Sequence, residues 1–236
     1  MSSVNENEER FAALFYPGTQ VLRNVPGLHD NAELARFEAG AVISRAVELD
    51  EDRGIVPRTH DLQQLAAIHH HLFQDVYPWA GDIRDVNMQK GGKPFAHYAN
   101  ISMYMDAVAY DLRESPELRS FRKETFVDKA AEVFSYVNQA HPFREGNGRA
   151  TRLFMESVVE DISPAWAIDL RQARVEQAQW NESSHASRPE VGEFSPNPAA
   201  LRELFGAAVR DRSARRERGA ELGTLERQSE SLGYER

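Results

Sequence analysis

The most informative stretch of this chain is His141-Pro-Phe-Arg-Glu-Gly-Asn-Gly-Arg-Ala-Thr-Arg152. Apolar residues with helical spacing lead into it over residues 126–137 and out of it over residues 153–159. Glycines at the start of a helix expose backbone N–H groups, which together form an anion site. Histidine is easily poised as a base near neutral pH, a carboxylate is a natural Mg²⁺ ligand, and arginines bind phosphate oxygens. The stretch therefore predicts a site that holds a metal-bound polyphosphate and deprotonates a nucleophile.

The composition narrows the class of protein. The chain has 236 residues, a formal net charge of -9 and no cysteine, so we expect one domain of ordinary size plus a tail. The negative charge argues against direct binding of nucleic acid, and the lack of cysteine excludes disulfides and thiolate metal sites. No apolar run approaches the roughly 18–20 residues that cross a bilayer. Because the acidic, polar N-terminus is also unlike a secretory signal, we expect no membrane partner and a cytoplasmic location.

Helical spacing of apolar residues dominates most of the chain. In residues 33–49 the apolar positions fall on one stripe, and Asp30 or Asn31 is placed to cap the start of that helix. Further helices are predicted at residues 61–73, 101–112 and 125–140 and, from weaker patterns, at residues 170–180 and 199–209. We therefore expect an all-α fold, a helical bundle.

Residues 83–97 depart from this pattern. Short alternating stretches flank Gly91-Gly92, which predicts a hairpin turn between two strands. Pro94 confines the second arm to an edge, because proline cannot donate to a strand ladder. We expect a small, exposed β-hairpin flap on the helical body. Residues 183–198 predict a loop, and from about residue 210 the Arg-rich composition predicts frayed helix or disorder.

The stretch from His141 to Arg152 matches every fixed position of His-x-Phe-x-(Asp/Glu)-Gly-Asn-Gly-Arg-x-x-Arg, the motif of the Fic family, which the chain resembles. Trp79-Ala-Gly-Asp-Ile-Arg84 resembles the segment that leads into the Fic flap, and Lys93-Pro-Phe-Ala-His-Tyr98 resembles the flap itself. The resemblance implies a Fic domain over residues 30–185, with its flap at about 83–98 and its active-site loop at 141–152. Residues 1–29 are then an N-terminal extension, and residues 186–236 a helical or disordered tail.

The resemblance implies an enzyme that transfers AMP from ATP to a hydroxyl side chain of a target protein, with Mg²⁺. By motif position, His141 is the general base on a Tyr, Ser or Thr hydroxyl, Glu145 holds Mg²⁺, and Phe143 anchors the loop in the core. The nucleotide-binding positions are Gly146, Asn147 and Gly148, which form the anion hole, and Arg149 and Arg152, which bind the β and γ phosphates. Doc relatives, which phosphorylate instead, carry different residues in this loop, so the intact glycines favour AMP transfer.

The exposed edge of the predicted flap suggests how a target protein would bind to it. An exposed strand edge offers unpaired N–H and C=O groups, so a segment of the target can add to it as a further strand. The resemblance assigns this target-binding flap to Lys93, Phe95, Ala96 and His97, with Phe95 as an apolar clamp.

Plainer interpretations exist for other patterns. His69-His70-His71 cannot converge on one metal ion, since consecutive helical residues point about 100° apart, so we expect structural or solvent-facing roles.

Ser2-Ser-Val-Asn-Glu6-Asn7 fits the (Ser/Thr)-x-x-x-Glu-(Gly/Asn) pattern of Fic inhibitory helices, whose glutamate pairs with the second motif arginine, here Arg152. Ser3 and Glu6 are equally a capping box for a helix starting near residue 8. We therefore expect a separate small antitoxin to supply the inhibitory glutamate.

The resemblance to single-domain Fic toxins implies a toxin of a toxin–antitoxin pair and makes DNA gyrase and topoisomerase IV candidate targets. One alternative is a self-inhibited or secreted Fic effector that modifies a host protein. Another is a non-catalytic module that only binds a nucleotide, against which the histidine at position 141 argues.

Overall fold

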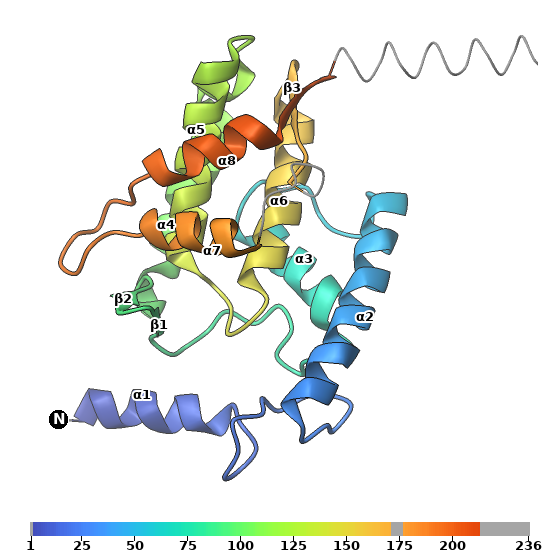
Figure 1. Ribbon diagram of the computed structural model, residues 1–236, viewed down its shortest axis with the longest axis vertical. Coiled ribbons are helices and arrows are strands. Elements are labelled where there is room, and N and C mark those ends of the chain that lie inside the picture. Colours follow the sequence, from blue (N-terminus) through green and yellow to red (C-terminus); the bar gives the residue numbers. More distant parts are fainter. Residues whose placement is uncertain (1, 171–176, 213–236) are drawn as a thin grey trace, which may run out of the picture.

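The computed structural model describes residues 2–170 and 177–212, and these are mainly helical (Figure 1). The α-helices are α1 (Ser2–Ala13), α2 (Asn31–Glu51), α3 (Leu62–Phe73), α4 (Ile101–Glu114), α5 (Lys123–Ala140), α6 (Asn147–Ile162), α7 (Gln177–Ala186) and α8 (Ala199–Ala208). Short 3-10 helices, η1 and η2, cover Tyr98–Asn100 and Pro116–Arg119. The strands form two antiparallel pairs, β1 (Gln89–Lys90) with β2 (Lys93–Pro94) and β3 (Trp166–Ile168) with β4 (Val209–Asp211). The prediction of a helical bundle with a small hairpin is confirmed.

Side-chain caps fix where α2 and α3 begin. The carboxylate of Asp30 accepts hydrogen bonds from the backbone N–H groups of Ala32 and Glu33, so Asp30, one of the two predicted candidates, caps α2. Asp61 caps α3 in the same way, through the N–H groups of residues 63 and 64. Each such cap is worth about 1 kcal/mol.

The core lies around α5, which packs against α4, α6 and α8. Phe126 and Phe134 of α5, Phe154 of α6 and Phe205 of α8 are all buried. Burial of each such side chain contributes roughly 1.5–3 kcal/mol. The sequence assigns α8 to a tail, but its buried face makes it part of the packed body, so the folded region extends past residue 185. Residues 213–236 lie outside the described part of the chain, so the predicted disorder there stays a prediction.

The β3–β4 pair was not predicted, because strands of three residues are too short to show a period. It joins the end of α6 to the end of α8, with Trp166 opposite Asp211 and Ile168 opposite Val209. The guanidinium of Arg212 then donates to the carbonyl oxygens of Glu160 and Ser163 at 2.7 Å each. These bonds satisfy free carbonyls at the C-terminus of α6.

The predicted flap is present as β1 and β2, joined by Gly91 and Gly92 with φ angles of 61° and 80°. Two successive positive φ values suit the right-handed twist of a hairpin and favour glycine. α1 lies apart from the bundle on the side of the flap (Figure 1), where the side-chain oxygen of Asn7 accepts a hydrogen bond from the N–H of Asn87 at 2.6 Å. Across the described residues, no helix combines the length and apolarity that a membrane span needs.

Candidate active site

The motif forms the loop between α5 and α6, and left-handed backbone conformations bracket it. His141 ends α5 with φ 43° and ψ 61°, and Gly146 precedes α6 with φ 82° and ψ -2°. A histidine with positive φ is uncommon and costs on the order of 1–3 kcal/mol, so the surroundings must impose it. Gly146 is needed for a second reason, because a Cβ atom there would lie 2.4 Å from the ring of Phe73.

The buried side chain of Asn147 forms hydrogen bonds across the loop. Its side chain is 5% exposed, its oxygen accepts from the N–H of Phe143 at 2.9 Å, and its amide nitrogen donates to the Phe143 carbonyl at 2.7 Å. Phe143 itself is fully buried in the core, as the sequence predicts. Both polar atoms of the Asn147 side chain are thus engaged in holding the loop closed.

His69 of α3, for which the sequence predicted a structural or solvent-facing role, is buried and holds the loop in position. Its Nε2 donates to the carbonyl of Glu145 and its Nδ1 accepts from the N–H of Gly81, both at 2.9 Å. The ring is buried and stacks on Phe143 with centroids 3.8 Å apart. Burial lowers the pKa of His69 to about 4, which keeps the ring neutral. A signal was available, because His69 lies on the apolar face of α3 between Leu65 and Leu72.

His141 lies against the flap. Its ring stacks on Phe95 with centroids 3.6 Å apart, and its carbonyl accepts from Nε of Arg84 at 2.7 Å. The protein packed around the ring lowers its pKa well below the ordinary histidine value, and the positive charges of Arg84, Arg188 and Lys90 lower it further. A neutral imidazole is the form that can accept a proton.

Arg84 ties the base of the flap to the loop. It is 6% exposed, and besides His141 its guanidinium donates to the carbonyls of Val86, Ala96 and Ala140. Burial lowers its pKa to about 10, so it remains charged at neutral pH. The segment that resembles the entry to a Fic flap therefore ends in the side chain that fixes the flap to the C-terminus of α5.

Arg149, the first motif arginine, is held by a carboxylate from α2. Its Nη1 lies 2.6 Å from Oε1 of Glu38, its Nη2 lies 3.9 Å from Oε1 of Glu145, and its guanidinium lies over the Phe73 ring. The hydroxyl of Tyr77 donates to the other oxygen of Glu38. Glu38 was not identified from the sequence, because more than a hundred residues separate it from its partner.

Arg152, the second motif arginine, lies one turn further along α6. Its Nε donates to the carbonyl of Gly148 at 3.1 Å, and its guanidinium lies 5.7 Å from the centroid of the Trp180 ring in α7. Burial lowers its pKa from the usual arginine value. Nothing occupies the space within 4 Å of a Cβ atom built on Gly148, so the first turn of α6 is open there.

Glu145 is the acidic side chain of the loop, and its Oε1 accepts from the N–H of Gly146 at 3.0 Å. The side chain is 47% exposed. In the described residues no group of three or more His, Cys, Asp or Glu side chains could hold a metal ion. One accessible carboxylate still fits Mg²⁺, because this ion usually takes one or two carboxylates together with substrate phosphates and water.

Some of the predicted flap residues lie beside the motif loop and others do not. Phe95 and Ala96 are buried beside it, and the N–H of Ala96 donates to the carbonyl of Gln139 in α5 at 2.9 Å. Lys93 points toward the segment after α7, with its ammonium 2.6 Å from Glu190. His97 is exposed and accepts a hydrogen bond from the N–H of Ala99, so it caps η1. These contacts place Phe95 next to the motif histidine and give His97 a local structural task.

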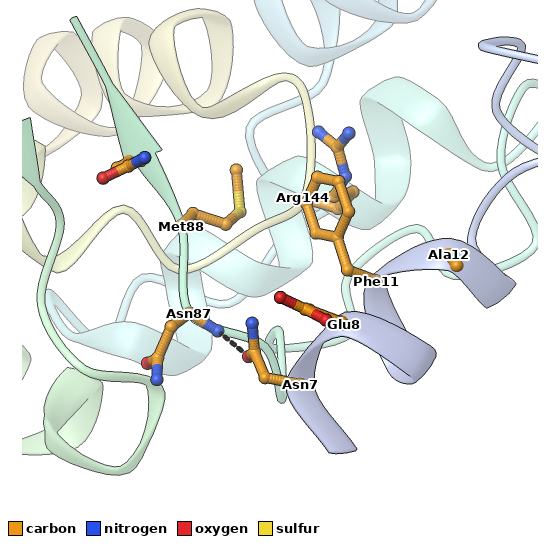
Figure 2. A pocket seen from close by; sticks show the side chains of 8 residues that line it. Asn7, Glu8, Phe11, Ala12, Asn87, Met88 and Arg144 are labelled. Carbon is orange, nitrogen blue, oxygen red and sulfur yellow. Dashed lines mark hydrogen bonds between the residues drawn. The ribbon is translucent and has the colours of Figure 1, made fainter. Parts of the chain in front are cut away.

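A pocket of about 520 Å³ opens between α1 and the first arm of the flap (Figure 2). Phe11 and Arg144 both line it and are in contact, with the guanidinium 4.7 Å from the ring centroid. Met88 of the flap also lines it. The N-terminal extension therefore borders the first arm of the flap.

Comparisons with known proteins identify this arrangement. The model of the Fic/DOC family matches residues 59–159. A Salmonella typhimurium protein described as "Probable protein adenylyltransferase Fic" is 33% identical over 196 residues, which cover 82% of this chain and 90% of that protein. The protein adenylyltransferase VbhT of Bartonella schoenbuchensis is 37% identical over 139 residues, 59% of this chain and 29% of VbhT. The solved structure of BepC from Bartonella tribocorum with bound AMPPNP has a TM-score of 0.74 at 25% identity and covers 85% of this chain and 98% of its own.

The site, the fold and these similarities define a Fic-type nucleotidyltransferase. The chain belongs to the Fic/DOC family and is a protein adenylyltransferase.

Proposed function

We propose that this chain transfers AMP from ATP to a Tyr, Ser or Thr hydroxyl of a target protein, with His141 as the general base. The observation that carries the proposal is the position of His141. Its neutral ring lies against Phe95 of the flap and four residues before Glu145 at the phosphate loop. A base between a docking edge and an anion site can deprotonate a hydroxyl that the edge presents.

In the proposed reaction, His141 accepts the proton of the target hydroxyl as that oxygen attacks the α-phosphorus of ATP. The new bond joins the target oxygen to the α-phosphorus, and the bond between this phosphorus and the oxygen that bridges to the β-phosphate breaks. Pyrophosphate leaves. The backbone N–H groups of Gly146, Asn147 and Gly148 at the start of α6 would stabilise the negative charge on the phosphate oxygens.

Arg149 and Arg152 would hold the β and γ phosphates. Both guanidinium groups project from the first turns of α6, and bound AMPPNP in the BepC structure supports a nucleoside triphosphate as donor. Glu145 would hold Mg²⁺, which neutralises phosphate charge when bound. Arg149 must then share its guanidinium between Glu38 and the nucleotide.

The flap would hold the target's backbone. Phe95 would clamp the residue next to the modified hydroxyl, and the free edge of the hairpin would pair with the target as an added strand. Lys93, Ala96 and His97 form the rest of this arm.

The biological setting is also a proposal, that of a toxin restrained by a separate antitoxin. Glu6, the residue that a self-inhibited form would use, is 60% exposed and lies 3.7 Å from Arg10 of its own helix. That contact supports a glutamate supplied in trans to Arg152. DNA gyrase and topoisomerase IV are the candidate targets. A secreted effector is the alternative, and it has support in the resemblance to BepC, described as a VirB-translocated effector.

The test is labelling with ATP that carries ³²P at either the α or the γ position, with Mg²⁺, in bacterial lysate and with purified candidate targets. We expect a protein band labelled only from the α position and absent with His141→Ala. Label from the γ position would refute AMP transfer in favour of phosphorylation. A wild-type protein that binds ATP but labels no lysate protein or candidate target would favour the binding-only alternative. Arg202→Lys, on the outer surface of α8, is the matched control and should label normally.

A further inference from the structure

Arg188, which follows the C-terminus of α7, binds the turn of the flap. Arg188 is 3% exposed, and its guanidinium donates to the carbonyl of Lys93 at 2.9 Å and to that of Lys90 at 2.7 Å. Lys90 and Lys93 are paired across the hairpin, so one side chain joins both arms at the turn. His185, one turn earlier in α7, also contacts the guanidinium and packs close to Gly91.

The same guanidinium also reaches the stack on the motif histidine. Its Cζ lies 4.4 Å from the centroid of the Phe95 ring, and that ring lies 3.6 Å from the ring of His141. Phe95 is 7% exposed. Arg188 thus contacts the flap twice, through its backbone at the turn and through the aromatic ring that packs on the proposed base.

Arg188 is in turn fixed to α5. The side chain of Asn138, three residues before His141, donates to the carbonyl of Ser184 at 2.7 Å and to the hydroxyl of Ser187 at 3.2 Å. Ser187 is fully buried, and its carbonyl accepts from the N–H of Asn197 at 2.8 Å. The guanidinium therefore ties the flap to the same helix end that carries His141.

We propose that Arg188 is a positioning residue that sets the flap and its Phe95 at the distance from His141 at which a target segment is held. This inference rests on the proposed function, because it assigns the flap to target binding. Arg188 lies beyond residues 59–159, the range that the family model matches. Lysine cannot replace it, because only the planar guanidinium donates to two carbonyls at once while lying on an aromatic face.

The first experiment separates target binding from nucleotide binding. In Arg188→Lys we expect kcat/KM for the target protein to fall about tenfold or more, the factor that corresponds to one lost hydrogen bond from a charged donor. The KM for ATP should stay within about twofold, because the nucleotide groups on α6 keep their contacts. Arg202→Lys of α8, whose exposed side chain pairs with Asp128, is the matched control and should change neither value. Equal changes in both substrates' constants, or no change, would overturn the proposal.

The second experiment needs neither nucleotide nor target. The N–H groups of Phe95 and Ala96 are hydrogen bonded to Met88 and Gln139, so their hydrogen exchange reports how firmly the flap is held. Arg188→Lys should speed their exchange about tenfold while the amides of α5 keep the wild-type rate. Unchanged flap exchange would refute the positioning role. If the wild type transfers no AMP, the proposed function fails, and this exchange measurement still decides whether Arg188 holds the flap.

Should Arg188→Lys fail to fold, Asn138→Ala gives the same test by a different route. It removes the two hydrogen bonds that tie the Arg188 segment to α5 and leaves the guanidinium intact. Faster exchange at Phe95 and Ala96, with the target KM raised and the ATP KM unchanged, would support the proposal. Wild-type values throughout would overturn it.

Discussion

Gly146→Ala should destabilise the fold far more than the matched change Gly148→Ala, two residues later in the same loop. An alanine at position 146 must adopt φ near 82°, which costs roughly 1–2 kcal/mol in the left-handed region. Its Cβ would also lie 2.4 Å from the ring of Phe73, a fully buried side chain. Overpacking of this kind costs typically about 1–3 kcal/mol. The two effects together predict a loss of about 2–5 kcal/mol in the free energy of unfolding.

An alanine at position 148 would cause neither backbone strain nor a steric clash. Its backbone is helical and nothing lies within 4 Å of a built Cβ atom. Because glycine is a poor helix former, Gly148→Ala should be neutral or stabilise by up to about 1 kcal/mol. Urea denaturation measures both free energies. In thermal melts, Gly146→Ala should lose about 4–20 °C, at roughly 2–4 °C per kcal/mol for a domain of this size.

A double-mutant cycle with Phe73→Leu separates the two causes. Leucine removes the ring that the new methyl group would strike, but it leaves the backbone strain in place. The double mutant should therefore be about 1–3 kcal/mol more stable than the sum of the two single changes predicts. Strict additivity would mean that the ring contact does not constrain Gly146. A Gly146→Ala protein within 1 kcal/mol of the wild type would refute the whole account of the loop.

Three further predictions concern the residues around the loop. His69 has a folded pKa of about 4 against an ordinary value of about 6.5, so the folded state binds fewer protons and stability falls as the pH drops from about 6.5 to 4. Between pH 7 and pH 4.5 this costs about 2.5 kcal/mol, a component that urea denaturation should find missing in His69→Gln. Glu38→Gln keeps an acceptor for Tyr77 but breaks the ion pair with Arg149, so the free energy of unfolding should fall by about 1–3 kcal/mol, and a stability equal to wild type would show that the pair contributes nothing. Phe95→Ala should raise the KM for the target and leave the KM for ATP near the wild-type value in steady-state transfer assays, whereas a raised ATP KM would contradict the assignment of the flap to the target.

Local patterns predicted most of the elements. The apolar stripes located α2 to α5 to within a few residues, Asp30 was one of two candidates for the cap that begins α2, and Gly91-Gly92 identified the hairpin. Each of these signals lies within a few residues of the structure it predicts. The motif histidine and the two arginines were also found locally, because they belong to one loop and the first turns of one helix.

The supporting side chains could not be found in this way. Glu38 and Arg149 come from helices far apart in sequence, and nothing in the composition of α2 marks one glutamate among several. Arg188 lies in a stretch whose Ser, Pro and Glu content predicts only a loop, and its importance depends on a hairpin nearly a hundred residues earlier. Such contacts are fixed by the packing of the whole bundle, which a single sequence does not reveal.

Several of the contacts that support the site meet at the C-terminal end of α5. Asn138 fixes the Arg188 segment, the carbonyl of Gln139 accepts the N–H of Ala96 in the flap, and His141 ends the helix. Because the proposed base and these two attachments of the flap share one rigid helix end, the gap between base and docking edge does not depend on how distant elements move. The proposed nucleotide-binding groups belong instead to the start of α6 and the loop before it, which are held from α2 and α3 through Glu38 and His69. Substitutions at the end of α5 should therefore disturb target binding, and substitutions on α2 and α3 should disturb nucleotide binding, which a kinetic comparison of the two substrates can separate.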